Sequence, residues 1–170
     1  MSDRQPLSAP TCLTSNHFFQ NFDSGEAALD AWLKERALDN LTLGASRTYV
    51  ICPADSLTVI GYYALSMGQI LNQEVVGSMR RNMPRQIPAV MLGRLAIDQQ
   101  WQGKGLGRAL LKDAVQRSVR VAQEVSARLL IVHALTPEAE HFYVHHGFSK
   151  LPIETPTYAL DLVKYTQVVK

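Results

Sequence analysis

The sequence predicts a single α/β (α+β) domain with a mixed central sheet. Its 170 residues fall within the usual size of one globular domain. Hydrophobic residues make up 46% and charged residues 19%, which supplies a core and excludes a disordered chain. Short β-type apolar runs alternate with segments whose apolar residues recur at helical spacing. We therefore expect one domain over residues 1–170, with residues 1–16 as an irregular N-terminal segment.

Local signals define the expected elements in order. Asp23 or Ser24 can cap a helix whose apolar stripe includes Trp32. Two runs rich in β-branched and aromatic residues flank a Pro-Ala-Asp-Ser turn, which predicts a hairpin. Thr136 and the proline after it predict the start of the last helix, and Gly147 predicts its end. The expected elements are a helix from residue 23 or 24 to about 38, strands at 48–52, 57–67 and 88–97, a helix at 105–125, a strand at 128–134, a helix at 136–147 and a strand at 158–165.

Cysteine usage and hydropathy restrict the class of protein. Cys12 and Cys52 show neither a CxxC motif nor zinc-type spacing, so we expect reduced thiols and a cytoplasmic protein. No apolar run nears the roughly 20 residues that span a bilayer, and no signal peptide is visible, so we expect no membrane association. His141 and His145 are four residues apart, but the glutamate of HExxH and a third ligand are missing, so we expect no metal site.

Positive charge is concentrated in the middle of the chain. Residues 75–128 contain ten basic residues against three acidic ones, whereas the remainder carries a net charge of −5. This asymmetry favours a polyanionic ligand or partner for the central segment. A merely solvated basic surface is the alternative.

A glycine-rich turn between the strand ending at Ile97 and the next helix is the most informative motif. Three glycines at spacing two allow a sharp turn and let backbone N–H groups at a helix N-terminus approach a phosphate. The pattern is neither a Walker A loop nor a dinucleotide-binding fingerprint. We expect it to bind a pyrophosphate, with an ordinary strand-to-helix turn as the alternative. The residues of this turn are Gln102, Gly103, Lys104, Gly105, Leu106, Gly107 and Arg108.

Two stretches resemble motifs of the GNAT acetyltransferase superfamily. The first is LGRLAIDQQWQGKGLGRALLKDAVQR, in which Gln102, Gly105 and Gly107 match the Q/R-x-x-G-x-G/A core. The second is EAEHFYVHHGF, an aromatic pair followed by Gly-Phe. The resemblance implies a GNAT-like sheet, splayed at an acetyl-CoA site and flanked by helices. It also implies that the turn 102–108 holds the pyrophosphate and that the backbone of Leu95, Ala96 and Ile97 holds the pantetheine.

Acetyl transfer from a thioester needs a proton for the departing thiolate, and a phenol can supply it. Tyr143 matches the general-acid tyrosine of the family, with a half-buried helix aromatic as the alternative. The cofactor strand, residues 89–97, lacks the carboxylate that many of these enzymes use as a base. A substrate amine that is less basic than lysine needs no such base. The amine of an aminoacyl ester is an example, because water or a backbone carbonyl could accept its proton. Asp98 is a reserve candidate for the base, with turn capping as its alternative.

The stretches FDSGEAALDAWLKERALDN and SRTYV extend the similarity to the acetyltransferase toxins of bacterial toxin–antitoxin pairs. That resemblance implies acetylation of the α-amino group of aminoacyl-tRNA, arrest of translation and neutralisation by a small DNA-binding antitoxin. We also expect a homodimer.

Arg80, Arg81 and Arg85 suit phosphate contacts in tRNA, with an antitoxin carboxylate site or solvation as alternatives. Arg94 could line the substrate cleft or pair with a buried acid.

Two other function classes fit the sequence. An acetyltransferase for a small amine or a protein N-terminus would use the same turn and Tyr143 without needing the arginines. A non-enzymatic nucleic-acid or regulatory binding module would bind tRNA or DNA without acetyl-CoA, although the complete glycine-rich turn argues against it.

Overall fold

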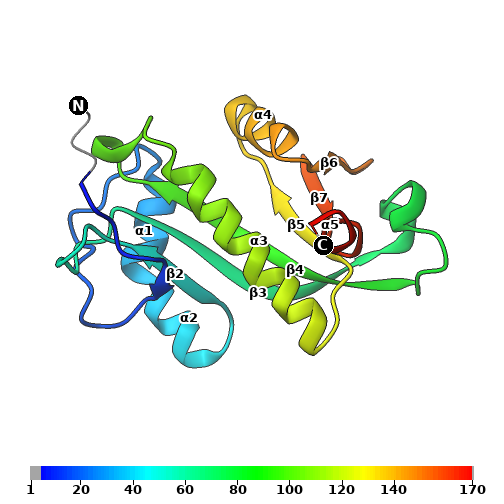
Figure 1. Cartoon of the computed structure of the whole chain (residues 1–170), viewed down its shortest axis with the longest axis horizontal. Coiled ribbons are helices and arrows are strands. Elements are labelled where there is room, and N and C mark those ends of the chain that lie inside the picture. The colour runs from blue at the N-terminus through cyan, green and yellow to red at the C-terminus, as the bar shows by residue number, and fades with distance from the viewer. Residues whose placement is uncertain (1–4, 170) are drawn as a thin grey trace. The chain divides into compact units, whose positions relative to one another are not determined.

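The computed structural model describes residues 5–169, with side chains up to residue 166. Within this range the strands are β1 (Thr11–Cys12), β2 (Arg47–Ile51), β3 (Gly61–Leu71), β4 (Gln86–Ile97), β5 (Leu129–His133), β6 (Ser149–Lys150) and β7 (Thr157–Asp161) (Figure 1). The helices are α1 (Ala27–Glu35), α2 (Ala37–Leu43), α3 (Leu106–Glu124), α4 (Pro137–His145) and α5 (Leu162–Val169), with short 3-10 turns η1 (Asn72–Glu74), η2 (Gly77–Met79) and η3 (Gln99–Trp101).

The strands form one mixed sheet in the order β1-β2-β3-β4-β5-β7-β6. β4 and β5 are parallel, as a strand pair joined by a crossover helix must be, and α3 is that crossover. β1, β2 and β3 pair antiparallel, and so do β5, β7 and β6. The α/β architecture expected from the alternation of patterns is therefore confirmed.

β4 extends beyond its pairing with β5. The paired residues run from Ala89↔Leu129 to Leu92↔Val132, whereas β4 continues to Ile97. β4 therefore continues past its last pair with β5.

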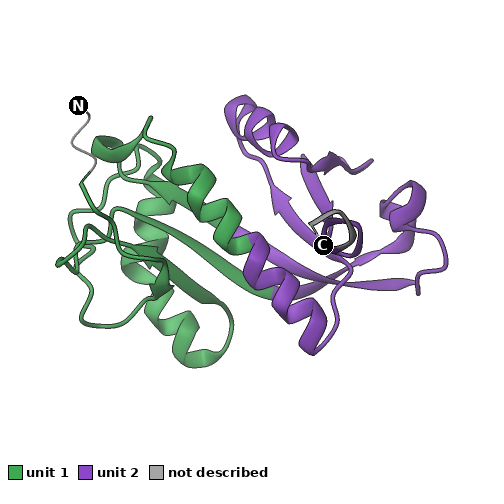
Figure 2. Cartoon of the chain, viewed as in Figure 1, with its two compact units in different colours: residues 1–66, 94–114 green, residues 67–93, 115–170 purple. Residues whose placement is uncertain are grey.

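The chain forms two compact units, each with its own core (Figure 2). Unit 1 comprises the residues up to Ser66 together with 94–114, and unit 2 comprises residues 67–93 and 115–170. The core of unit 1 places α1 and α2 against the first strands, and its buried members are Leu13, Phe19, Phe22, Leu33, Ala37, Val50, Cys52, Val59, Tyr62 and Ala96. The core of unit 2 is formed by Ile70, Val75, Met79, Ile87, Ala89, Leu129, Ile131, Leu151 and Ala159.

The N-terminal segment is more ordered than its sequence indicates. Thr11 and Cys12 pair with Val50 and Tyr49 as strand β1, and the backbone N–H of Ser8 donates to the carbonyl of Cys52 at 2.8 Å. The expectation of an irregular segment over residues 1–16 is wrong for this part, and residues 1–4 lie outside the described range. A two-residue strand is too short to produce a readable alternation of polar and apolar residues.

The first predicted helix is in fact two helices with a later start. Gly25 adopts φ +91°, a left-handed conformation that separates Ser24 from the helix, so α1 begins at Ala27. The Ser24 hydroxyl donates to Asp30 at 2.7 Å instead of capping the helix as predicted. The helix ends at Glu35 because Arg36 leaves helical geometry, and α2 follows.

The C-terminal strand is shorter than predicted. β7 ends at Asp161, whose carboxylate accepts hydrogen bonds from the backbone N–H groups of Val163 and Lys164. These bonds satisfy N–H groups of a helix start, so α5 replaces the second half of the expected strand. By contrast α4 begins as predicted, because the Thr136 hydroxyl accepts from the N–H of Ala139 at 3.1 Å.

Candidate functional site

The glycine-rich turn, residues 102–108, lies in unit 1; it follows η3 and runs into the first residues of α3. Gly103 and Gly105 adopt φ +78° and +80°, which only glycine occupies readily. A Cβ atom built on either residue meets nothing within 4 Å, so open space faces the turn. Glycine is therefore required here by the backbone conformation and leaves room for a ligand against the main chain.

Gln102 braces this turn. Its side-chain Nε2 donates to the carbonyl oxygens of Ser24 at 2.9 Å and Ile97 at 2.8 Å. Both amide hydrogens are thus used within the protein. Gln102 was predicted as a ligand contact, but its side chain ties the turn to the end of β4 and to the segment before α1.

The charges around the turn suit an anion. Lys104 and Arg108 are exposed, and the Lys104 ammonium lies 5.0 Å from the centroid of the Trp101 ring. Leu106, the first residue of α3, is buried. The N–H groups in the first turn of this helix have no partners within the helix, and the positive end of the helix dipole lies there. Backbone donors, two cations and open space together fit a pyrophosphate.

The strand leading into the turn ends in a capped bend. Ala96 and Ile97 are buried and Leu95 is half-buried, which leaves mainly backbone groups of this stretch to meet a ligand. Asp98 follows, and its two carboxylate oxygens accept from the N–H groups of Gln100 at 3.0 Å and Asp23 at 3.1 Å. This geometry agrees with the capping role of Asp98 rather than with its use as a base.

Tyr143 lies in unit 2 on α4. Its ring is buried and makes edge-to-face contacts with Phe142 and Phe148, at centroid distances of 5.2 and 5.4 Å. Burial raises the pKa of the Tyr143 phenol above its usual value. A phenol with the ordinary pKa of about 10 is already protonated at neutral pH, and this shift acts in the same direction.

Three predicted arginines lie together in the connection between β3 and β4. Arg80, Arg81 and Arg85 are all exposed in unit 2. The turn that carries them uses left-handed residues at Gly77, with φ +61°, and at Asn82, with φ +60°. We call residues 77–85 the arginine segment.

Arg94 lies apart from that segment, on the portion of β4 that belongs to unit 1. Its guanidinium carbon stands 4.5 Å from the centroid of the Trp32 ring, and Trp32 in turn stacks on Tyr62 at 6.0 Å. The Arg94 side chain is half-buried. A cation–π contact was not among the two roles predicted for Arg94, because Trp32 was assigned to the core alone.

Sequence reasoning also missed a cavity in unit 1 and an ion pair in unit 2. The cavity has a volume of about 440 Å³, and Phe18, Phe22, Asp98 and Trp101 are among the residues that line it. The ion pair joins Arg128 to Asp161 at 3.0 Å. Neither has a local signal in the sequence, because the residues involved are far apart along the chain.

Within the described residues, no group of three or more His, Cys, Asp or Glu side chains is arranged to hold a metal ion. None of the helices in that range is both long and apolar enough to cross a bilayer.

Comparisons with known proteins agree with this geometry. The tRNA-acetylating toxin of Mycobacterium tuberculosis is 41% identical over 157 residues, covering 92% of this chain and 93% of that protein. The structure of AtaT complexed with acetyl-methionyl-tRNAfMet superimposes with a TM-score of 0.89 and 28% identity, covering 96% of this chain and 99% of that chain. A tyrosine-to-phenylalanine mutant of AtaT, bound to the C-terminus of the antitoxin AtaR and acetyl-CoA, gives a TM-score of 0.81 and 27% identity, covering 96% and 98% of the two chains.

The family model described as an acetyltransferase (GNAT) domain matches residues 59–150, more than half of the chain. The matched region contains the glycine-rich turn, the arginine segment and Tyr143. The chain belongs to the GNAT family of acetyltransferases.

Proposed function

We propose that the protein acetylates the α-amino group of aminoacyl-tRNA with acetyl-CoA and thereby blocks translation. The observation that carries this proposal is the 41% identity, over nearly the whole of both chains, to a tRNA-acetylating toxin. The complexes of AtaT with acetylated tRNA, acetyl-CoA and antitoxin support the same substrate, cosubstrate and class of partner. The protein then acts in the cytoplasm as a homodimeric toxin that a small DNA-binding antitoxin neutralises.

Acetyl-CoA supplies the acetyl group as a thioester, and the chain holds its pyrophosphate at the turn 102–108. The backbone N–H groups of Gly103 and Gly105 are accessible because these glycines are exposed. Lys104 and Arg108 add positive charge beside them. The backbone of Leu95, Ala96 and Ile97 binds the pantetheine, since β4 continues here past its last pair with β5.

Tyr143 acts as the general acid. The nitrogen of the aminoacyl ester attacks the thioester carbonyl carbon, the carbon–sulfur bond breaks, and the phenol of Tyr143 gives its proton to the departing sulfur. A backbone N–H on the extended part of β4 stabilises the negative charge that develops on the carbonyl oxygen. At neutral pH the phenol of Tyr143 carries its proton until that step.

The proton lost by the amine goes to water. The strand 89–97 carries no carboxylate, and both oxygens of Asp98 are bound to backbone N–H groups. An α-amino group has a pKa of roughly 8, against roughly 10.4 for lysine, and esterification lowers it further. A weak acceptor is sufficient for such an amine, which favours aminoacyl-tRNA over a lysine side chain as the substrate.

The arginine segment binds phosphates of the tRNA. Arg80, Arg81 and Arg85 are exposed, and the planar fork of a guanidinium matches a phosphate. Contacts of this kind position a nucleic acid and make its affinity strongly dependent on salt.

The decisive experiment compares methionine esterified to tRNA with free methionine as acceptors of labelled acetyl-CoA. We expect efficient transfer to methionyl-tRNA and little to the free amino acid. Efficient transfer to free methionine with none to the charged tRNA would instead identify a small-amine acetyltransferase. Binding of tRNA without binding of acetyl-CoA would identify a non-enzymatic binding module.

A charge-reversal variant tests the arginine segment. Replacing Arg80, Arg81 and Arg85 by glutamate should weaken tRNA binding and flatten its salt dependence, while acetyl-CoA affinity stays unchanged. The control changes Arg36, Lys112 and Arg120 to glutamate, three exposed cations with the same total charge change. An equal loss of tRNA affinity in both variants would indicate a general effect of net charge and would contradict a specific role for the arginine segment.

A further inference from the structure

The arginine segment is folded onto unit 2 by its apolar side. Val75 and Met79 are buried in the core of this unit, and Met83 packs against it. The N–H of Arg80 donates to Gly77 O at 3.1 Å, and the N–H of Met83 donates to Arg80 O at 3.2 Å. The turns and the packing of Met79 and Met83 thus leave the arginines exposed, while the carbonyl of Ser78 faces another side chain.

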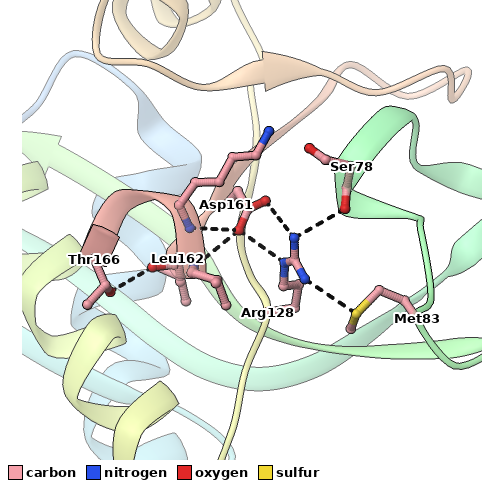
Figure 3. Close-up of polar contacts among 8 residues, drawn as sticks. Ser78, Met83, Arg128, Asp161, Leu162 and Thr166 are labelled. Carbon is pink, nitrogen blue, oxygen red and sulfur yellow. Dashed lines mark hydrogen bonds and ion pairs between the residues drawn. The ribbon is translucent and has the colours of Figure 1, made fainter. Parts of the chain in front are cut away.

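That side chain is Arg128, which lies just before β5 (Figure 3). Its Nη2 donates to Ser78 O at 3.1 Å, and its Nη1 lies 3.6 Å from the sulfur of Met83. These two contacts bracket Arg80 and Arg81 along the chain. One guanidinium therefore holds both sides of the turn that presents the two exposed arginines.

Arg128 is itself rigidly held. Its Nε and Nη2 donate to the two oxygens of Asp161, both at 3.0 Å, in a bidentate pair. Its backbone N–H donates to Pro88 O, and its carbonyl accepts from the N–H of Leu162, both at 2.9 Å. Asp161 is fixed in turn by the backbone N–H groups of Val163 and Lys164 at the start of α5.

The ion pair with Asp161 makes Arg128 unavailable for direct contact with tRNA. The side chains of Arg128 and Asp161 are only 18% and 9% exposed, and the carboxylate neutralises the guanidinium. Arg128 belongs to the basic stretch by sequence, yet its donors point into the protein. It is therefore unsuited to bind a phosphate directly.

We infer that Arg128 is a positioning residue for tRNA recognition, which fixes the turn between Ser78 and Met83 so that Arg80 and Arg81 meet the phosphates together. The inference rests on the proposed binding of tRNA by the arginine segment. Arginine is required because one planar fork serves a carboxylate, a carbonyl and a sulfur at once. A lysine could keep the contact with Asp161 but not the others.

The test is Arg128→Lys, which keeps the charge and a partner for Asp161, with Arg120→Lys on the exposed surface of α3 as the control. We expect the KM for methionyl-tRNA to rise about 10-fold, the lower end of what a hydrogen bond from a charged group contributes. The value of kcat and the KM for acetyl-CoA should stay within about twofold, because Arg128 contacts neither reacting group. A purely structural role would change all three constants.

Limited trypsin digestion provides a readout that does not depend on tRNA. Cleavage after Arg80 and Arg81 should be faster in Arg128→Lys than in the wild type or in Arg120→Lys, because the turn is released. If Arg128→Lys does not fold, Asp161→Asn keeps an oxygen for the α5 cap, weakens the hold on Arg128 and should show the same changes at smaller size.

The outcomes separate the two proposals. A wild-type protein that acetylates neither methionyl-tRNA nor any other charged tRNA overturns the proposed function. A wild-type protein that acetylates a charged tRNA, with unchanged trypsin cleavage and unchanged KM for tRNA in both variants, overturns the role of Arg128. Faster cleavage with an unchanged KM for tRNA also overturns it, because the segment would then be loose without consequence for binding.

Discussion

Removing the Gln102 side chain should weaken both the fold of unit 1 and its affinity for acetyl-CoA. Gln102→Ala deletes the hydrogen bonds to Ser24 O and Ile97 O, at 2.9 and 2.8 Å. Each such hydrogen bond contributes about 1 kcal/mol net to stability, so the free energy of unfolding should fall by about 2 kcal/mol. For a protein of this size that corresponds to a fall in Tm of about 4–8 °C.

The same energy sets the effect on ligand binding. A turn that is no longer braced must be ordered when acetyl-CoA binds, so up to about 2 kcal/mol, or roughly 30-fold, should be lost in Kd. Differential scanning calorimetry measures the first effect and isothermal titration calorimetry the second. Gln100→Ala is the control, because it makes the same chemical change on an exposed residue two positions earlier.

Two results would refute this reasoning. A weaker Kd with an unchanged Tm would mean that Gln102 contacts acetyl-CoA directly, against the geometry of its amide. A lower Tm with an unchanged Kd would mean that the conformation of the turn does not matter for binding. Gln102→Glu provides a second test. Its carboxylate has no donor for the two carbonyls, so this variant should lower Tm and acetyl-CoA affinity more than Gln102→Ala does.

Three further predictions follow from the site. Gly105→Val should abolish acetyl-CoA binding in calorimetry, because a β-branched residue at φ +80° is strained and displaces the backbone from the ligand. The control is Gly44→Val, at φ +74° with equally open space, which should introduce the same backbone strain and leave acetyl-CoA binding intact. Tyr143→Phe should lower kcat about 100-fold with acetyl-CoA affinity unchanged, and full turnover under conditions where chemistry is rate-limiting would remove Tyr143 from the mechanism. Because burial raises the pKa of Tyr143, the folded state should lose stability as pH rises above the unfolded value of about 10, and urea titrations should find a smaller loss in Tyr143→Phe.

Elements with local signals were predictable from the sequence. α4 begins at its capping threonine and proline, and the glycine-rich turn precedes α3, because each signal acts within a few residues. The start of α1 was not predictable in the same way. Asp23 and Ser24 are good capping residues, but the left-handed Gly25 places them outside the helix, and their side chains bind elsewhere.

The supporting contacts of the site could not be predicted because they join distant parts of the chain. Gln102 meets the carbonyl of a residue 78 positions earlier, and Arg128 meets Asp161 33 positions later. Glycines, cations and a tyrosine identify the groups that meet a ligand. The residues that hold those groups in place have no motif, since any donor at the right point in space could serve.

The short strands at the two ends of the sheet limit how other chains can join it. β1 and β6 each contain two residues, so each of these two strands offers only a few unpaired backbone groups. Long free edges are what allow one chain to extend the sheet of another, in aggregation as well as in peptide capture. β1 and β6 therefore present little template for strand addition, whether by another copy of the chain or by a peptide.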